Sequence, residues 1–77
     1  MKNKLISLLQ ELIVETDRVN LVGIKVSIMQ NTAFLAQPKT IGEISNIMNA
    51  VNSFIDSPNS NNKANVENVI ERLNEKF

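Results

Sequence analysis

The sequence contains no cysteine, histidine, tryptophan or tyrosine, and it has only two glycines and two prolines. Without cysteine there can be no disulfide and no thiolate zinc site, and without histidine the commonest metal ligand and proton shuttle is missing. The usual nucleophile and base pairs of hydrolytic enzymes are therefore absent. The acidic side chains fall on expected solvent faces or helix ends, where nothing would tune a pKa for catalysis. We expect a protein that is not an enzyme and that binds no metal or cofactor.

An excess of charge of one sign is also lacking, because eight basic residues balance eight acidic ones. Proteins that bind nucleic acid neutralise phosphates with a basic patch, and each part of this chain is close to neutral. We therefore do not expect nucleic acid as a partner.

Long hydrophobic runs are missing as well. The N-terminal run of residues 5–9 stops at Gln10 and Glu11, which makes it too short for a signal peptide or for the roughly 20 residues of a membrane span. We expect a cytoplasmic protein that does not enter a membrane.

The length of 77 residues predicts a single helical domain over residues 1–77. A chain of this size buries only about 60% of the surface that its unfolded form exposes. Small domains usually supplement such a core with disulfides, a metal or oligomerisation. Without cysteine and histidine the first two are hard to reach, so association with a second copy or another protein is expected.

Apolar residues recur at spacings of three and four over most of the chain, which is typical of amphipathic helices. We expect helices at about residues 3–19, 21–37, 41–56 and 62–76. The fold class that follows is all-α, a small antiparallel bundle of about four helices. One face of the first helix is expected to carry its apolar residues. It comprises Leu5, Leu8, Leu9, Leu12, Ile13, Thr16 and Val19.

Residues 21–36 are ambiguous, because apolar and polar residues alternate from Val22 to Ile28 as in a half-buried strand. The alternative fold is therefore α+β, with a short hairpin in this segment. As a helix, the segment carries two apolar stripes, as a helix between two neighbours would need. We favour the helix, because an isolated hairpin is marginally stable. One stripe comprises Val22, Val26, Met29, Ala33 and Ala36, and the other comprises Leu21, Ile24, Ile28 and Leu35.

The clearest local signal is the segment from Thr40 to Glu43. It has the spacing of a capping box, in which the Thr40 hydroxyl accepts from the Glu43 amide and the Glu43 carboxylate reaches back to the Thr40 amide. The third helix is expected to begin here. Its wide apolar face includes Ile47 and Phe54, which are candidate partner contacts if a homodimer or another protein covers that face.

Glu67, Glu71 and Glu75 follow one another at intervals of four and form an acidic ridge on the fourth helix. Like charges at this spacing slightly destabilise a helix, so a ridge that faces a partner is a reasonable hypothesis. We therefore list these three glutamates as further candidate partner contacts.

The function that remains is a non-enzymatic protein-protein interaction module, such as an inhibitor, an adaptor, or an immunity-type or chaperone-type helper, that binds a protein partner through helix faces. The alternative is a small helix-turn-helix transcriptional regulator with its turn at Asn49 inside residues 40–51. That alternative lacks a basic recognition helix, because Val51 to Ile55 carries no Arg or Lys.

Overall fold

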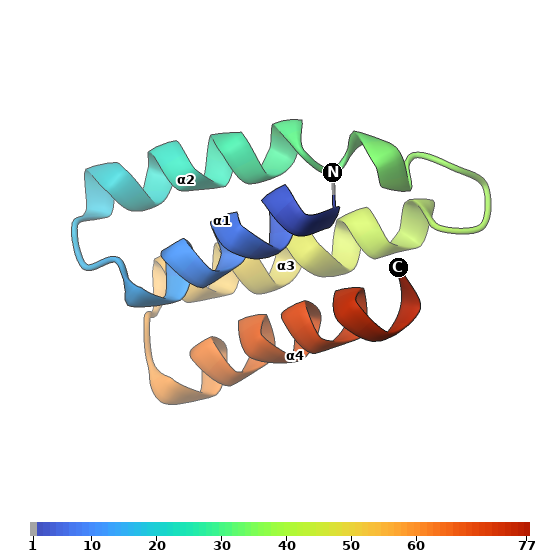
Figure 1. Cartoon of the computed structure of the whole chain (residues 1–77). Helices are drawn as coiled ribbons and strands as arrows, with labels where there is room; N and C mark the ends of the chain where they lie inside the picture. Colours follow the sequence, from blue (N-terminus) through green and yellow to red (C-terminus); the bar gives the residue numbers. More distant parts are fainter. Residues whose placement is uncertain (1) are drawn as a thin grey trace.

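The structure, a computed structural model, describes residues 2–77. Four α-helices run in alternating directions along one long axis (Figure 1). They are α1 (Lys2–Val14), α2 (Arg18–Gln30), α3 (Ile41–Asp56) and α4 (Ser60–Lys76), with a short 3₁₀ helix, η1 (Ala33–Leu35), before α3. The predicted small all-helical bundle is confirmed. The hairpin alternative is wrong, because α2 occupies most of that segment.

The helices form a bundle of 34 × 22 × 18 Å. Helix α1 packs against α2 and α4, and α3 packs against the same two helices. Helices α2 and α4 therefore occupy diagonal corners, at the top and bottom of Figure 1. The core between them is a single cluster of buried aliphatic residues with one phenylalanine. It consists of Leu5, Ile6, Leu8, Leu9, Leu12, Leu21, Ile28, Leu35, Ile47, Val51, Phe54, Ile55, Val66 and Leu73.

The first helix ends five residues earlier than expected, at Val14. A side-chain oxygen of Glu15 accepts hydrogen bonds from the amides of Thr16 and Asp17, both at 3.1 Å. Asp17 then becomes the N-cap of α2 and accepts from the Val19 amide at 2.9 Å. Short polar side chains that bind nearby amides in this way compete with the helix and favour a break. Val19 consequently belongs to α2 and not to the first helix.

The second helix ends at Gln30 and not at residue 37. Two side chains bind carbonyls of its last turn: the Asn31 amide donates to Ser27 O and the Thr32 hydroxyl donates to Met29 O, each at 2.8 Å. Thr32 is buried, so its hydroxyl needs this partner. Residues 33–35 continue only as a 3₁₀ turn before Pro38, which restricts the backbone that precedes it.

The predicted bounds of the third helix, 41–56, are confirmed, but the predicted capping box is wrong. Thr40 is the N-cap residue, yet its side chain accepts no cap hydrogen bond. Its hydroxyl donates instead to Leu35 O at 2.8 Å. The Glu43 carboxylate turns away from Thr40 and binds Arg72 of α4. Contacts with other elements therefore outweigh the local motif.

The fourth helix begins at Ser60, two residues earlier than expected, because Asn59 caps it. The Asn59 side chain accepts from the Asn62 amide at 2.9 Å. The Asn62 side chain in turn donates to Ser57 O at 2.7 Å and to Ser53 O at 3.1 Å. One asparagine thus joins the end of α3 to the start of α4.

Candidate functional site

The most unusual surface of the molecule is a line of exposed apolar side chains along α2. Val19 is 79% exposed, Val22 49%, Val26 48% and Met29 53%. We call these four residues the α2 stripe. Isolated exposed valines are common on protein surfaces, but four on one helix face form a continuous apolar line.

The α2 stripe exists because α2 has apolar residues on two faces and neighbours on only one. Leu21 and Ile28 are buried against the core, and Ile24 packs partly against it. The other predicted stripe points away from the bundle, and beyond Met29 it continues into the exposed residues Ala33 and Ala36. Helix α2 has two neighbouring helices, as expected, but α1 and α3 both leave the α2 stripe exposed within residues 2–77.

The intervals between the α2 stripe residues are three, four and three, which is the spacing of the a and d positions of a coiled coil. Val19 and Val26 take a, and Val22 and Met29 take d. The positions beside this line are occupied by Gly23 and Gln30 on one side and by Arg18 and Lys25 on the other. No acidic residue of α2 flanks the stripe.

Helix α2 is held in place mainly at its ends. The Asp17 cap fixes its first turn, and the Arg18 guanidinium donates to Ile55 O at the end of α3, at 3.3 Å. Asn31 and Thr32 fix its last turn. The stripe therefore lies on a helix whose conformation the chain already sets.

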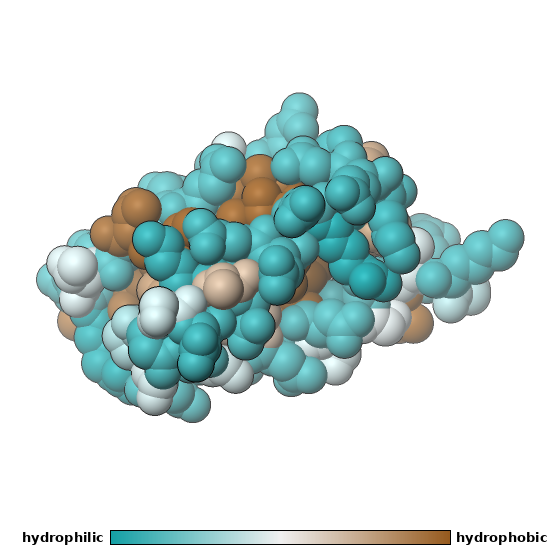
Figure 2. Space-filling view, turned by 90° about the horizontal axis from the view of Figure 1, so that it is seen from below, coloured by the Kyte–Doolittle hydropathy of each residue, from teal (hydrophilic) through white to brown (hydrophobic). Residues whose placement is uncertain are grey.

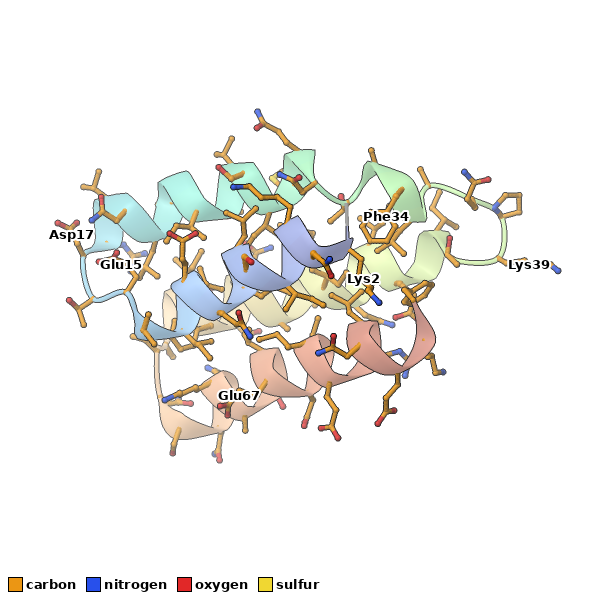
Figure 3. The ribbon with its side chains drawn as sticks, viewed as in Figure 1. Lys2, Glu15, Asp17, Phe34, Lys39 and Glu67 are labelled. Carbon is orange, nitrogen blue, oxygen red and sulfur yellow. The ribbon has the colours of Figure 1, made fainter. Side chains whose placement is uncertain are left out.

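The predicted acidic ridge is present on the surface of α4. Glu67, Glu71 and Glu75 are all exposed. Figure 3 shows Glu67 on the lower helix, far from Glu15 and Asp17 at the turn between α1 and α2. Viewed from the α4 side, most of the surface is hydrophilic, and hydrophobic atoms show only in separate areas (Figure 2). The ridge and the α2 stripe thus lie at opposite corners of the bundle.

The two apolar candidates for partner contact, Ile47 and Phe54, lie elsewhere. They are 1% and 3% exposed and belong to the core that this chain forms by itself. The structure thus does not bring them together with the three glutamates. Both are therefore mainly core residues of the single chain.

A cavity of about 430 Å³ lies at the end of the bundle where α1 meets α2 and α3 meets α4. Its lining is mainly apolar, and the two charged residues at its edge are Glu15 and Lys63. Such a hollow can accommodate an apolar group. The apolar part of the lining comprises Ile13, Val14, Leu21, Phe54 and Pro58.

Three further results bear on other functions. Helix α3 continues without a break through Asn49, so the turn that the helix-turn-helix alternative requires there is not formed. Within residues 2–77, no group of three or more acidic side chains is placed to hold a metal ion. No helix in the same range has the length and apolar character needed to cross a bilayer.

Sequence reasoning missed two features of these surfaces. It placed Val19 inside the first helix, although Asp17, a good capping residue just before Arg18, was a usable signal for a new helix. It also did not pair Glu43 with Arg72, for which no local signal exists because the two residues are 29 positions apart.

The chain matches no protein-family model, and no curated protein or solved structure matches it either. Its function is therefore inferred from its own surfaces.

Proposed function

We propose that this protein is a non-enzymatic protein-protein interaction module that associates with a second copy of itself and binds a protein partner through exposed helix faces. The α2 stripe is the observation that carries the proposal. Its four side chains are 48–79% exposed, on a helix whose first and last turns are both held by side-chain hydrogen bonds. Soluble monomers rarely leave a contiguous apolar patch of this kind uncovered.

The α4 ridge supports the second part of the proposal. Glu67, Glu71 and Glu75 project from the corner opposite α2, so a partner with a basic face could bind there while the α2 stripe is covered. Exposed charges of this kind mainly increase the rate and the specificity of association. A cytoplasmic location, expected from the lack of cysteine, is part of the same proposal.

The test is affinity capture with the tagged chain in cells that produce it, followed by measurement of binding with the purified captured protein. Two variants are compared with the wild type: Val22→Gln combined with Val26→Gln, and Glu67→Gln combined with Glu71→Gln. Val14→Gln is the matched control, because Val14 is 73% exposed and lies outside both surfaces.

We expect a protein bound at fixed stoichiometry, lost in at least one of the two variants and retained in the control. Capture that is equal in all four chains, or recovery of nucleic acid in place of protein, would refute the proposed function.

A further inference from the structure

We infer that the α2 stripe is the seam of a parallel, two-fold homodimer in which α2 of one copy packs along α2 of a second copy. The inference rests on the proposed function, because it names the occupant of the same surface and the direction in which that occupant runs.

The spacing of the four stripe residues favours a second copy of α2 as the occupant. Intervals of three, four and three between Val19, Val22, Val26 and Met29 admit only one assignment, with valine at both a positions. β-branched residues at a favour two-stranded parallel coiled coils when leucine stands at d, and here the d positions hold Val22 and Met29, of which only the second is unbranched at Cβ. A second copy of α2 supplies an identical line of side chains, and self-complementary surfaces of this kind are the basis of two-fold dimers.

The charges beside the seam distinguish a parallel from an antiparallel pair of α2 helices. In a parallel pair, Lys25 faces Gln30 of the second copy and Arg18 faces Gly23 of the second copy, so no like charges meet. In an antiparallel pair, the edges that carry Arg18 and Lys25 face each other, and four basic side chains gather on one side of the seam. Juxtaposed like charges disfavour such an arrangement.

The way in which the bundle presents α2 also favours this pairing. The helix sits at a corner, and its conformation is fixed at both ends within the monomer. Association therefore does not have to form the helix, which is the costly step for short coiled coils. Beside the seam, apart from its chain neighbours and the nearby backbone of α2 itself, Gly23 has no atom within 4 Å of the place where a Cβ would lie.

The expected dimer is weak. A helix of 13 residues is about 20 Å long, so the interface belongs to the small, transient class. Self-association should therefore depend on concentration and be visible in sedimentation equilibrium over about a hundredfold range of protein concentration.

The first experiment compares the wild type with Val22→Gln combined with Val26→Gln, and with Val14→Gln as the control. Circular dichroism confirms that each variant keeps its helical content. We expect a monomer-dimer equilibrium for the wild type and the control, and a dissociation constant at least about tenfold higher for the double variant. A constant monomer mass for the wild type overturns the inference, as does a dimer that the double variant leaves unchanged.

The second experiment tests whether the two α2 helices run parallel or antiparallel. Because the sequence contains no cysteine, an introduced cysteine can form a disulfide only with its copy in the second chain. In the parallel dimer, Met29→Cys places two thiols across the seam, within the short Cα separation that a disulfide needs. In the antiparallel dimer the same positions are roughly 15 Å apart. We expect rapid cross-linking of Met29→Cys under mild oxidation and little of Val14→Cys. A stripe-dependent dimer in which Met29→Cys stays reduced overturns the parallel arrangement.

The two proposals fail separately. A wild type that is monomeric throughout, yet captures another protein through the α2 stripe, overturns the homodimer, and with it the self-association in the proposed function, but leaves the binding of a protein partner intact. A dimer that captures no protein does the opposite.

Discussion

Arg72 of α4 binds the Glu43 carboxylate of α3 through one edge of its guanidinium, formed by Nε and Nη2. Nη2 lies 2.8 Å from one carboxylate oxygen of Glu43, and Nε lies 2.9 Å from the other. Two parallel N-H donors that meet two carboxylate oxygens form the strongest kind of ion pair that these side chains make. This pair joins the helices across the bundle and explains why Glu43 does not cap α3.

The pH dependence of stability follows from this pair. The hydrogen bond from Arg72 lowers the pKa of Glu43 below its usual range. A lowered folded-state pKa contributes stability above the unfolded-state pKa, and that contribution is lost as the pH falls through the folded-state value. Urea titrations at a series of pH values test this. As the pH falls below about 5, we expect the free energy of unfolding to decrease less for Glu43→Gln than for the wild type. A Glu43→Gln variant whose stability falls as steeply with pH as that of the wild type would contradict the pair.

Thr40→Ala should lower the free energy of unfolding by about 0.5 to 1.5 kcal/mol, because it removes the hydroxyl that donates to Leu35 O. Two further variants separate this bond from a helix cap. Thr40→Ser keeps a donor and should restore most of the stability, whereas Thr40→Asp can accept as a cap but cannot donate when ionised. Recovery by Thr40→Asp would show that capping, and not the bond to Leu35, is what matters.

Ile47→Asp should unfold the chain, because Ile47 is 1% exposed and an unpaired carboxylate there would be buried. Ile41→Asp is the matched control on the same helix, since Ile41 is 58% exposed. Circular dichroism and thermal melting should show a folded Ile41→Asp and an unfolded Ile47→Asp. A folded Ile47→Asp would mean that this part of α3 is not in the core.

Gly23→Ala should stabilise the monomer by about 0.5 to 1 kcal/mol. Gly23 lies inside α2, and an added methyl group would meet no atom within 4 Å apart from its chain neighbours and the nearby backbone of its own helix. The measurement is urea denaturation at a concentration low enough to avoid self-association. A lower stability of Gly23→Ala would mean that the backbone of α2 is strained at this position.

The sequence predicted the helix bounds correctly where the apolar spacing and the helix-ending residues agreed. The third helix has a wide apolar face and is bounded by residues 38 and 58, both proline, and its bounds agree with the structure. The break between α1 and α2 was hidden, because Ile13, Thr16 and Val19 continue the helical spacing across it. A turn that leaves the apolar spacing unchanged cannot be recognised from that spacing. Here only the capping side chains indicate the turn.

The surfaces were predictable only in part, because periodicity gives the faces of a helix but not their neighbours. Both stripes of α2 were visible in the sequence, yet which of them turns inward depends on how α1 and α3 pack. For the same reason Phe54 resembled a partner contact and proved to be buried. The exposed position of Glu71 followed from helical spacing alone, since solvent faces require no partner.

Helix α2 contributes only Leu21 and Ile28 to the buried core, as few residues as α4 and fewer than α1 or α3. Its backbone amides should therefore exchange with solvent deuterium through partial openings that leave α1 and α3 closed. Anything that covers the α2 stripe must also slow that exchange, because ligation of the closed form lowers the population of the open one. The exchange rate of the α2 amides thereby reports whether the stripe is covered.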